Sequence, residues 1–273
     1  MPEGHTIHRA AKDQTPLVAG KKLRVSAHDG RCEEEAALLD GKKLSAIEPL
    51  GKHLFYHFAG RDKLTLHCHL GLLGKFRLHK KDPPEPRGAT RLRFRAGESV
   101  VDFVATLKAE VLDPDGTAEA KSKIGPDPLD PKADVEKVWR RISKSTAPIG
   151  GLLMNQQVVS GIGNIYRCEI LFRQKVHPRT PGKQLTRDQF DAIWRDSVDL
   201  LKLGVRYNRI ITVDRDFAKE RFGKTYSKLS RRDGFYVYKK TKCPMTGGPV
   251  EMFEIANRRV FFSPKWQPMP KGA

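Results

Sequence analysis

The sequence contains few cysteines and no long apolar run. Its four cysteines lie far apart, with no C-x-x-C pair, at Cys32, Cys68, Cys168 and Cys243. This spacing argues against a disulfide framework and against a zinc site made of thiolates. No apolar stretch reaches the roughly 20 residues that a membrane span needs, and the N-terminus lacks an apolar signal region. We therefore expect a soluble, cytoplasmic protein, associated with the nucleoid in a bacterium.

Acidic residues are also in short supply. The chain of 273 residues has 51 Lys and Arg against 32 Asp and Glu, a formal net charge of +19. Residues 1–125 carry 22 basic and 17 acidic side chains, whereas residues 126–273 carry 29 and 15. Within 202–242, 13 basic and 4 acidic residues are interleaved with aromatic ones. This pattern favours a nucleic-acid partner, and a merely solvated basic surface is the alternative.

The hydrophobic pattern changes near residue 125. Residues 4–19 have the apolar stripe of a helix, and residues 21–112 form short alternating runs broken by glycine. Many short strands with turns between them predict an antiparallel sandwich or barrel. The proline-rich IGPDPLDP, residues 124–131, marks a domain boundary.

Beyond this boundary the apolar period becomes helical. It predicts helices over 134–144, 148–160, 164–173 and from Thr186 to about Leu203. Thr186 with Gln189 forms a capping-box pattern. The basic segment 204–233 is irregular, and a β-hairpin is expected from FYVYKK, a CPMTGG turn and VEMFEIANRRVFFSP.

Two local motifs carry chemistry. Pro2 becomes a free secondary amine if Met1 is removed, and Glu3 stands directly beside it. An α-amino group titrates near pH 7.7–8.0, so a useful fraction is an unprotonated nucleophile at neutral pH. In SGIGNIYRCEILF, residues 160–172, Asn164 is placed to cap a helix whose first amides favour a phosphate, although the residues alone favour an ordinary helix–turn–helix corner.

Four histidines are concentrated on two predicted strands. His67 and His69 lie two apart, with His53 and His57 nearby, whereas Cys68 points to the other face. No acidic or thiolate ligand stands at a useful spacing, so we expect no metal site here.

Several motifs together resemble the formamidopyrimidine-DNA glycosylase and endonuclease VIII family of base-excision repair enzymes. They cover nearly the whole chain and are MPEGHTIHRA, GKHLFYHF, HLGLLGKFRL, IGPDPL, PIGGLLMNQQVVSGIGNIYRCEILF and VYKKTKCPMTGGPV. The similarity is greatest to the endonuclease VIII-like, actinobacterial-type branch. It implies an α+β protein with an N-terminal helix and antiparallel β-sandwich, a helix–two-turns–helix domain and a β-hairpin finger. The predicted domains are a catalytic sandwich at 1–125, a linker at 126–133, a DNA-binding domain at 134–233 and the finger at 234–273.

The resemblance also implies catalytic roles in the N-terminal domain. Pro2 matches the nucleophile that attacks C1′ of the damaged nucleotide, and Glu3 matches its acid/base partner. Lys52, in the turn Leu50-Gly51-Lys52-His53, matches a lysine that reaches the DNA phosphate and assists elimination.

Contacts with DNA follow from the same resemblance. Asn164 matches a phosphate-binding asparagine, and either Arg258 or Arg259 matches the finger arginine that grips phosphates beside the lesion. Leu72 matches an apolar wedge that fills the gap left by the extruded base. From its residues alone, Leu72 could equally be a core leucine.

Three departures from the family pattern affect these expectations. Only Cys243 occupies one of the four zinc-ligand places of the finger, the others being Thr246, Ser263 and Trp266, so we predict a zincless finger held by Phe253, Phe261, Phe262 and Trp266. Thr6 replaces a glutamate that arranges the lesion site, which affects substrate scope. The loop DFVATLKAE, residues 102–110, lacks the usual arginine and aromatic residue, so we expect weak discrimination of the base opposite the lesion.

The expected function is that of a bifunctional DNA glycosylase and AP lyase. It would excise oxidised pyrimidines through a Pro2 iminium intermediate and β,δ-elimination, as a monomer, on damaged duplex DNA and on single-stranded or bubble DNA. No cofactor is expected. Two alternatives stay open: an AP lyase without base excision, and a non-catalytic binder of damaged DNA.

Overall fold

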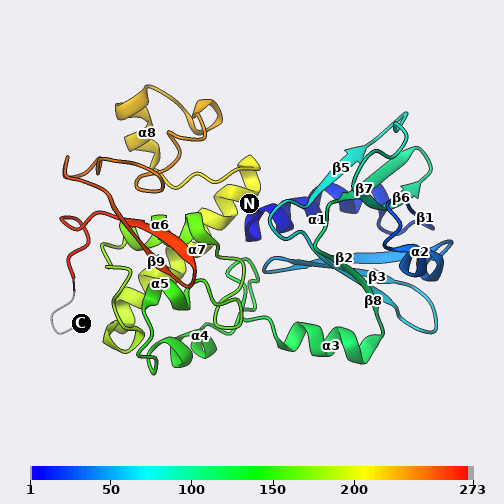
Figure 1. The fold of residues 1–273 in the computed structure, drawn as a ribbon, viewed down its shortest axis with the longest axis horizontal. Helices are drawn as coiled ribbons and strands as arrows, with labels where there is room; N and C mark the ends of the chain where they lie inside the picture. Colours follow the sequence, from blue (N-terminus) through cyan, green and yellow to red (C-terminus); the bar gives the residue numbers. More distant parts are fainter. Residues whose placement is uncertain (1, 270–273) are drawn as a thin grey trace. The chain divides into compact units, whose positions relative to one another are not determined.

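The computed structural model describes residues 2–269 (Figure 1). The chain divides into two compact units, the first ending at Lys123 and the second beginning at Ile124. The first unit consists of α1 (Gly4–Val18), β1 (Arg24–Ala27), α2 (Glu33–Leu39), β2 (Leu44–Leu50), β3 (His53–Phe58), β4 (Thr65–His69), β5 (Lys75–His79), β6 (Thr90–Ala96), β7 (Ser99–Val104), β8 (Lys108–Leu112) and α3 (Pro114–Ser122). No described helix is long and apolar enough to cross a membrane.

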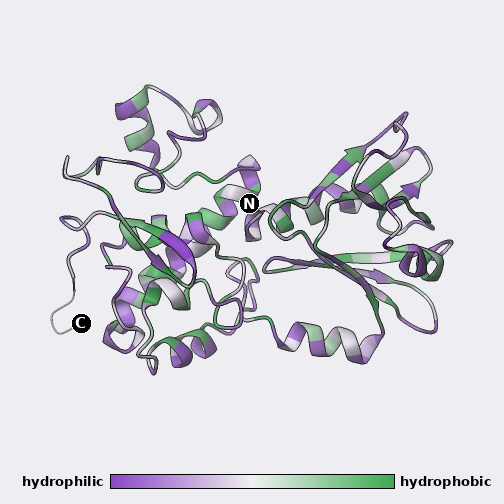
Figure 2. Ribbon diagram, in the orientation of Figure 1, coloured by the Kyte–Doolittle hydropathy of each residue, from purple (hydrophilic) through white to green (hydrophobic). Residues whose placement is uncertain are grey.

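Two four-stranded antiparallel sheets form the first unit, in the orders β1-β6-β7-β5 and β2-β3-β4-β8. Alternate residues of their strands bury apolar side chains in one core, which includes Tyr56, Phe94 and Phe103. Figure 2 shows the matching alternation of hydrophilic and hydrophobic residues along β5. The antiparallel sheets predicted from the short alternating runs are therefore confirmed, with α1 contacting strands of both sheets.

Two helices of this unit were not predicted from the sequence. Residues 33–39, EEEAALL, form α2, which buries Ala36 and Leu39 and has three glutamates in its first turn. Acidic residues there interact favourably with the helix dipole. Helix α3 begins with Asp113 as its N-cap, whose side chain accepts the Gly116 amide at 2.7 Å. Both helices are short, which makes their apolar period hard to detect.

The second unit is mainly helical. It contains α4 (Val135–Ile142), α5 (Ile149–Leu152), α6 (Asn164–Arg173), η1 (Gly182–Gln184), α7 (Arg187–Tyr207), α8 (Arg215–Phe222), η2 (Tyr226–Lys228), β9 (Glu251–Ile255) and β10 (Arg258–Phe262). The capping box of Thr186 and Gln189 is present at the start of α7. Nine of the ten residues of α6 are buried, so this helix forms the centre of the unit.

Three sequence predictions for this unit were wrong. The helix expected over 148–160 ends at Leu152, because the Gln156 side chain bonds the Met154 and Ile162 carbonyls and stabilises a turn instead. The segment 204–233 is not irregular throughout, since it contains α8. The hairpin does not include 235–240; β9 and β10 turn at Ala256 and Asn257, whose φ angles of 52° and 56° fit a type I′ turn.

Candidate functional site

The first group of candidate residues lies at the start of α1. Pro2 is half-buried, and Glu3 is the N-cap of the helix with no exposed surface. Glu3 and Thr6 form a capping box, in which the Glu3 amide donates to Thr6 Oγ1 at 3.5 Å. Met1 and its removal lie outside the described residues. The fold therefore places a buried carboxyl group directly after Pro2.

His5 adds a second buried polar side chain to this end of α1. Its Nε2 lies 3.3 Å from Thr6 Oγ1. Burial lowers the pKa of His5 to about 4. His5 is therefore neutral at neutral pH and adds no charge beside the chain start.

Lys52 lies in the two-residue turn that joins β2 to β3. Leu50 pairs with His53, and only Gly51 of the two turn residues has a positive φ, of 59°. This geometry matches a type II′ turn with glycine first, which explains the Gly-Lys order. The Lys52 side chain is half-buried. Helix α1 packs on β2 and β3, so the turn that holds Lys52 joins two strands that contact this helix.

Three histidines form a neutral cluster beside Lys52. His53 Nδ1 lies 2.9 Å from His67 Nε2, and the His53 and His69 rings are 4.7 Å apart. Burial lowers the pKa of all three, that of His53 to about 3, and the charge of Lys52 lowers those of His53 and His69 further. As expected, Cys68 points into the core.

An acidic neighbour was missed by sequence spacing. Glu110 pairs with His67 across β4 and β8, with Glu110 Oε1 3.4 Å from His67 Nδ1. Even so, no group of three or more His, Cys, Asp or Glu within residues 2–269 is arranged to hold a metal ion. His53 and His67 instead bond to one another.

His69 was considered in the sequence only as a metal ligand, and the structure gives it another possible role. Its Nδ1 accepts the Gly71 amide at 3.1 Å, so its proton is on Nε2, which leaves that nitrogen a donor. The signal was present in the motif His69-Leu70-Gly71. A neutral donor and the Lys52 ammonium together could bind one anionic oxygen.

Leu72 is exposed and does not belong to the core. It is 54% exposed, and two other leucines are more so, Leu73 at 84% and Leu107 at 69%. Leu107 lies against the same turn, because its amide donates to the His69 carbonyl at 3.0 Å and a Cβ at Gly71 would stand 2.8 Å from its own Cβ. The loop after β7 therefore lacks an aromatic residue but still presents an apolar one.

In the second unit, Asn164 is the first residue of α6. The expectation that it caps this helix was wrong: Gly163 is the N-cap, and no side-chain cap is present. The Asn164 side chain instead donates to the Arg259 carbonyl at 3.0 Å and accepts a hydrogen bond from Arg167 Nη2. Asn164 thus joins the start of α6 to β10.

Arg167 was missed from the sequence, although a charge within the apolar run IYRCEILF was the signal. It is wholly buried, and its Nη1 donates to the Gly150 carbonyl at 3.0 Å and the Ile255 carbonyl at 3.5 Å. Its Nη2 also donates to the Arg258 carbonyl at 3.4 Å. The hairpin backbone is therefore held to α6 by side-chain bonds at both strands.

Arg258 and Arg259 are both exposed at the start of β10. Successive residues of a strand point to opposite faces, and Val260 and Phe262 are buried on the face that Arg258 shares. Asn164 bonds the Arg259 carbonyl and Arg167 bonds the Arg258 carbonyl, so the structure brings Asn164 to the backbone at Arg259 and links it to Arg258 only through Arg167. Only one of the two side chains can face any given phosphate.

A second buried charge, Glu169, organises the approach to the hairpin. One carboxylate oxygen accepts the amides of Val237 and Tyr238, and the other accepts the Tyr236 amide and the Thr212 hydroxyl, at 2.6–2.8 Å. These contacts fix residues 236–238. The sequence showed Glu169 only as an unexplained acid in an apolar helix.

The basic segment is fastened to α6 by Arg173. This side chain pairs with Asp214 at 2.8 Å and with Asp196 at 2.9 Å, and it donates to the Thr212 carbonyl. The Tyr236 hydroxyl donates to Asp214 at 2.8 Å. These contacts fix the start of α8, and with it the basic side chains of this helix, relative to α6.

The residues of the finger do not fit a zinc ion. Cys243 is the one thiol, and hydroxyl or indole groups occupy the other three places. Burial opposes ionisation of Cys243, but hydrogen bonds from Ser263, Thr246 and two backbone amides outweigh it and lower its pKa. Trp266 donates to the Phe172 carbonyl at 3.0 Å, and Phe253 packs on Phe262.

Comparisons with known proteins agree with this geometry. Residues 1–108 match the Formamidopyrimidine-DNA glycosylase N-terminal domain, and residues 124–216 match the Formamidopyrimidine-DNA glycosylase H2TH domain. The chain is 38% identical to a Mycobacterium tuberculosis protein named Endonuclease 8 1, covering 98% of this chain and 100% of the relative. It is 26% identical to a Formamidopyrimidine-DNA glycosylase of Thermus thermophilus, covering 98% of each.

The solved structures support the fold. A complex between Lactococcus lactis Fpg and DNA containing an abasic site matches with a TM-score of 0.79 at 24% identity, covering 98% of this chain and 100% of that one. The α+β architecture of antiparallel sheets followed by a helical part is thereby confirmed. Together with the two domain matches, the 38% identity shows that the chain belongs to the formamidopyrimidine-DNA glycosylase and endonuclease VIII family of DNA repair glycosylases.

Proposed function

We propose that this protein is a bifunctional DNA glycosylase and AP lyase with Pro2 as nucleophile. The observation that carries the proposal is the wholly buried Glu3 carboxyl group, directly after Pro2 and fixed as the N-cap of α1. A buried acid beside an amine is the pairing that covalent catalysis with proton transfer requires. Family membership supplies the class of reaction.

The reaction begins with attack of the Pro2 nitrogen on C1′ of the damaged nucleotide. The bond from C1′ to the base breaks, the base leaves with a proton, and opening of the sugar gives an iminium ion at C1′. Glu3 protonates the sugar ring oxygen and later shuttles protons. Loss of a C2′ proton then expels the 3′ phosphate by β-elimination, and δ-elimination expels the 5′ phosphate. The product is a one-nucleotide gap with phosphate ends.

Backbone phosphates are proposed to bind both units. Lys52 and the Nε2–H of His69 provide donors in the first unit, and Asn164 with Arg258 or Arg259 provides them in the second. The basic segment 202–242 adds further positive charge. Each phosphate neutralised makes the affinity fall more steeply with salt.

The exposed leucines are proposed to fill the gap left by the extruded nucleotide. Leu72 supplies the wedge, and Leu107, which lies against the same turn, replaces the missing aromatic residue of the second loop. Leucine contacts the opposite base without hydrogen bonds, which supports weak discrimination of that base.

Oxidised pyrimidines are the proposed lesions, because the chain is similar to a protein named Endonuclease 8 1 over the full length of both. Damaged duplex DNA is the proposed partner, with single-stranded or bubble DNA also accepted, and the monomer is the proposed active form.

Borohydride trapping tests the proposal. The protein is incubated with a duplex carrying one abasic site, beside Pro2→Gly, Glu3→Gln and, as a matched control, Glu220→Gln in the exposed part of α8. Intact mass establishes whether Met1 is absent. We expect a covalent complex for the parent and the control, and its loss in Pro2→Gly. Tight binding without any complex would instead support a non-catalytic binder.

One observation favours the alternative of an AP lyase without base excision. The Thr6 hydroxyl accepts a hydrogen bond from the Glu3 amide and lies within hydrogen-bond distance of His5. It is therefore engaged by protein groups and is not directed at a damaged base. Duplexes with oxidised pyrimidines, 8-oxoguanine or an abasic site separate the two functions. Cutting of the abasic duplex alone, without release of any base, would favour this alternative.

A further inference from the structure

The outer face of sheet β1-β6-β7-β5 is rich in basic side chains along β5 and β6. On β5 and β6 the apolar residues Phe76, Leu92 and Phe94 face the core. The residues between them face outward and are Lys75, Arg77, His79, Arg91, Arg93 and Arg95. Asp102 on β7 is the acidic residue at the centre of this face.

Asp102 lies between two arginines and pairs with one of them. Arg77 on β5 and Arg93 on β6 are both in register with it. Arg93 takes both carboxylate oxygens, at 2.6 and 2.8 Å, and its Nη2 also donates to the Pro84 carbonyl at 2.8 Å. This arrangement neutralises Asp102 and ties the loop 80–88 across the sheet.

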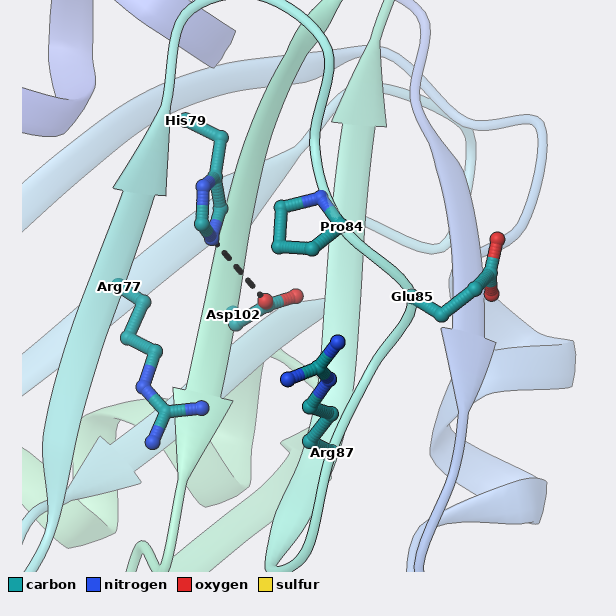
Figure 3. Close-up of a pocket in the computed structure, with 6 residues that line it drawn as sticks. All are labelled: Arg77, His79, Pro84, Glu85, Arg87 and Asp102. Atoms are coloured by element: carbon teal, nitrogen blue, oxygen red, sulfur yellow. Dashed lines mark ion pairs between the residues drawn. The ribbon is translucent and has the colours of Figure 1, made fainter.

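The tied loop brings Arg87 to the same place as Arg77. A pocket of about 360 Å³ is lined by Arg77, His79, Pro84, Glu85, Arg87 and Asp102. Figure 3 shows the two arginines on either side of Asp102, with the Glu85 carboxylate turned away. Neither guanidinium has a hydrogen bond or ion pair with any residue that the structure describes. His79 Nε2 lies 3.5 Å from Asp102 Oδ2.

We propose that this pocket binds a phosphate group between Arg77 and Arg87. Two guanidinium groups that line one pocket, and that are not themselves paired with a carboxylate, can each offer a phosphate a pair of N–H donors. The nearest carboxylate, Asp102, is already neutralised by Arg93 and presents little repulsion. The pocket has room for a phosphate with an attached sugar. This site does not depend on the glycosylase reaction, because none of its residues belongs to the proposed catalytic or DNA-gripping groups.

Titration calorimetry at low ionic strength tests the site with three probes of two kinds. Inorganic phosphate and thymidine 5′-monophosphate represent a free phosphate, and an oligothymidylate with hydroxyl ends represents a DNA backbone. The variants are Arg77→Ala, Arg87→Ala and Arg77→Lys. Arg24→Ala is the matched control, because Arg24 is exposed, lies on β1 at the far edge of the same sheet and carries the same charge.

We expect saturable binding of at least one probe, weakened roughly tenfold by either alanine and changed less than twofold by the control. Arg77→Lys keeps the charge but not the fork, so its affinity should fall between parent and alanine. If Arg77→Ala and Arg87→Ala weaken binding of the free phosphates alone, the ligand is a small one. If they also weaken binding of the oligonucleotide, the pocket contacts a DNA backbone, whereas probe binding that neither variant weakens lies elsewhere and would overturn the proposal. Equal weakening by Arg24→Ala, or no saturable binding of any probe, would overturn the proposal.

Discussion

Glu169→Gln is the substitution that tests how α6 organises the second unit. The carboxylate accepts four donors, two on each oxygen: the amides of Tyr236, Val237 and Tyr238, and the Thr212 hydroxyl. Glutamine has one acceptor oxygen and an NH₂ group that can only donate. In either orientation of the glutamine side chain, two of the four groups that donated to the carboxylate face its NH₂ group, which cannot accept their hydrogen bonds.

The structure indicates which orientation costs least. The Thr212 hydroxyl can rotate to accept from the NH₂ group, because it also bonds the Gly234 carbonyl and is not fixed to Glu169. The Tyr236 amide then stays buried without an acceptor, which costs about 1–3 kcal/mol. The bonds of Val237 and Tyr238 change from a charged to a neutral acceptor and lose about half their strength.

An opposing effect must be weighed against this loss. Burial raises the pKa of Glu169 despite its hydrogen bonds, so removing the buried charge by itself increases the stability of the folded protein. We expect the loss of stability at the three backbone amides to exceed the gain from removing the buried charge. Glu169→Gln should therefore lower the free energy of unfolding by about 2 kcal/mol. Glu169→Ala, which leaves all three amides without an acceptor, should lower it further.

Urea unfolding followed by circular dichroism measures both variants. Glu220→Gln is the control, since Glu220 is exposed on α8 and should change the stability by less than about 0.5 kcal/mol. If Glu169→Gln is as stable as the parent or more so, the burial of the charge outweighs its hydrogen bonds, and the reasoning fails.

Three further predictions follow from the site. Burial lowers the pKa of His53 to about 3, so below pH 6.5 the unfolded chain binds a proton at this residue and the folded chain does not. As the pH decreases, this histidine should lower the free energy of unfolding by up to about 1.4 kcal/mol per pH unit. Urea unfolding at pH 7, 5.5 and 4.5 should show a smaller dependence on pH for His53→Leu. The side chains of Arg258 and Arg259 point to opposite faces of β10, so only one of Arg258→Ala and Arg259→Ala should reduce the salt dependence of DNA affinity, by about one charge. Equal effects of the two substitutions would contradict a single phosphate contact. Leu107→Ala should reduce the fluorescence of 2-aminopurine placed opposite an abasic site, because the base restacks, whereas Leu38→Ala, 51% exposed on α2, should leave it unchanged.

The predictable parts of the fold are those where a single period governs a long segment. The strands between residues 21 and 112 alternate regularly, and α7 is long and carries a capping box, so both were evident. The short helices α2 and α5 were missed or overextended for the opposite reason. After α5 ends at Leu152, the Gln156 side chain bonds the carbonyls of Met154 and Ile162 and stabilises a turn. A turn held by one side chain leaves no periodic signal.

The candidate site divides along a similar line. Pro2 and Glu3 were proposed from the chain start and Lys52 from the family resemblance, and their roles stay predictions. The tight turn that holds Lys52 is present in the structure. The contacts that position the second group depend on pairs about 90 residues apart, such as Asn164 with Arg259. Sequence reasoning found Asn164 but assigned it a cap, since a cap is the local role that asparagine most often has at such a position.

The buried polar side chains of α6 hold the hairpin of β9 and β10 to the rest of the second unit. An isolated two-stranded hairpin is marginal in water, and a structural zinc ion would allow it to fold by its own ligands. Here β9 and β10 bury Val260 and Phe262 against the unit, and Arg167 and Asn164 bond carbonyls of both strands. The hairpin therefore has no folding unit of its own and is part of the same cooperative structure as α6. A change at Arg167 would displace the two exposed arginines of β10 without touching them, so we predict that it would also weaken the DNA contact proposed for these arginines.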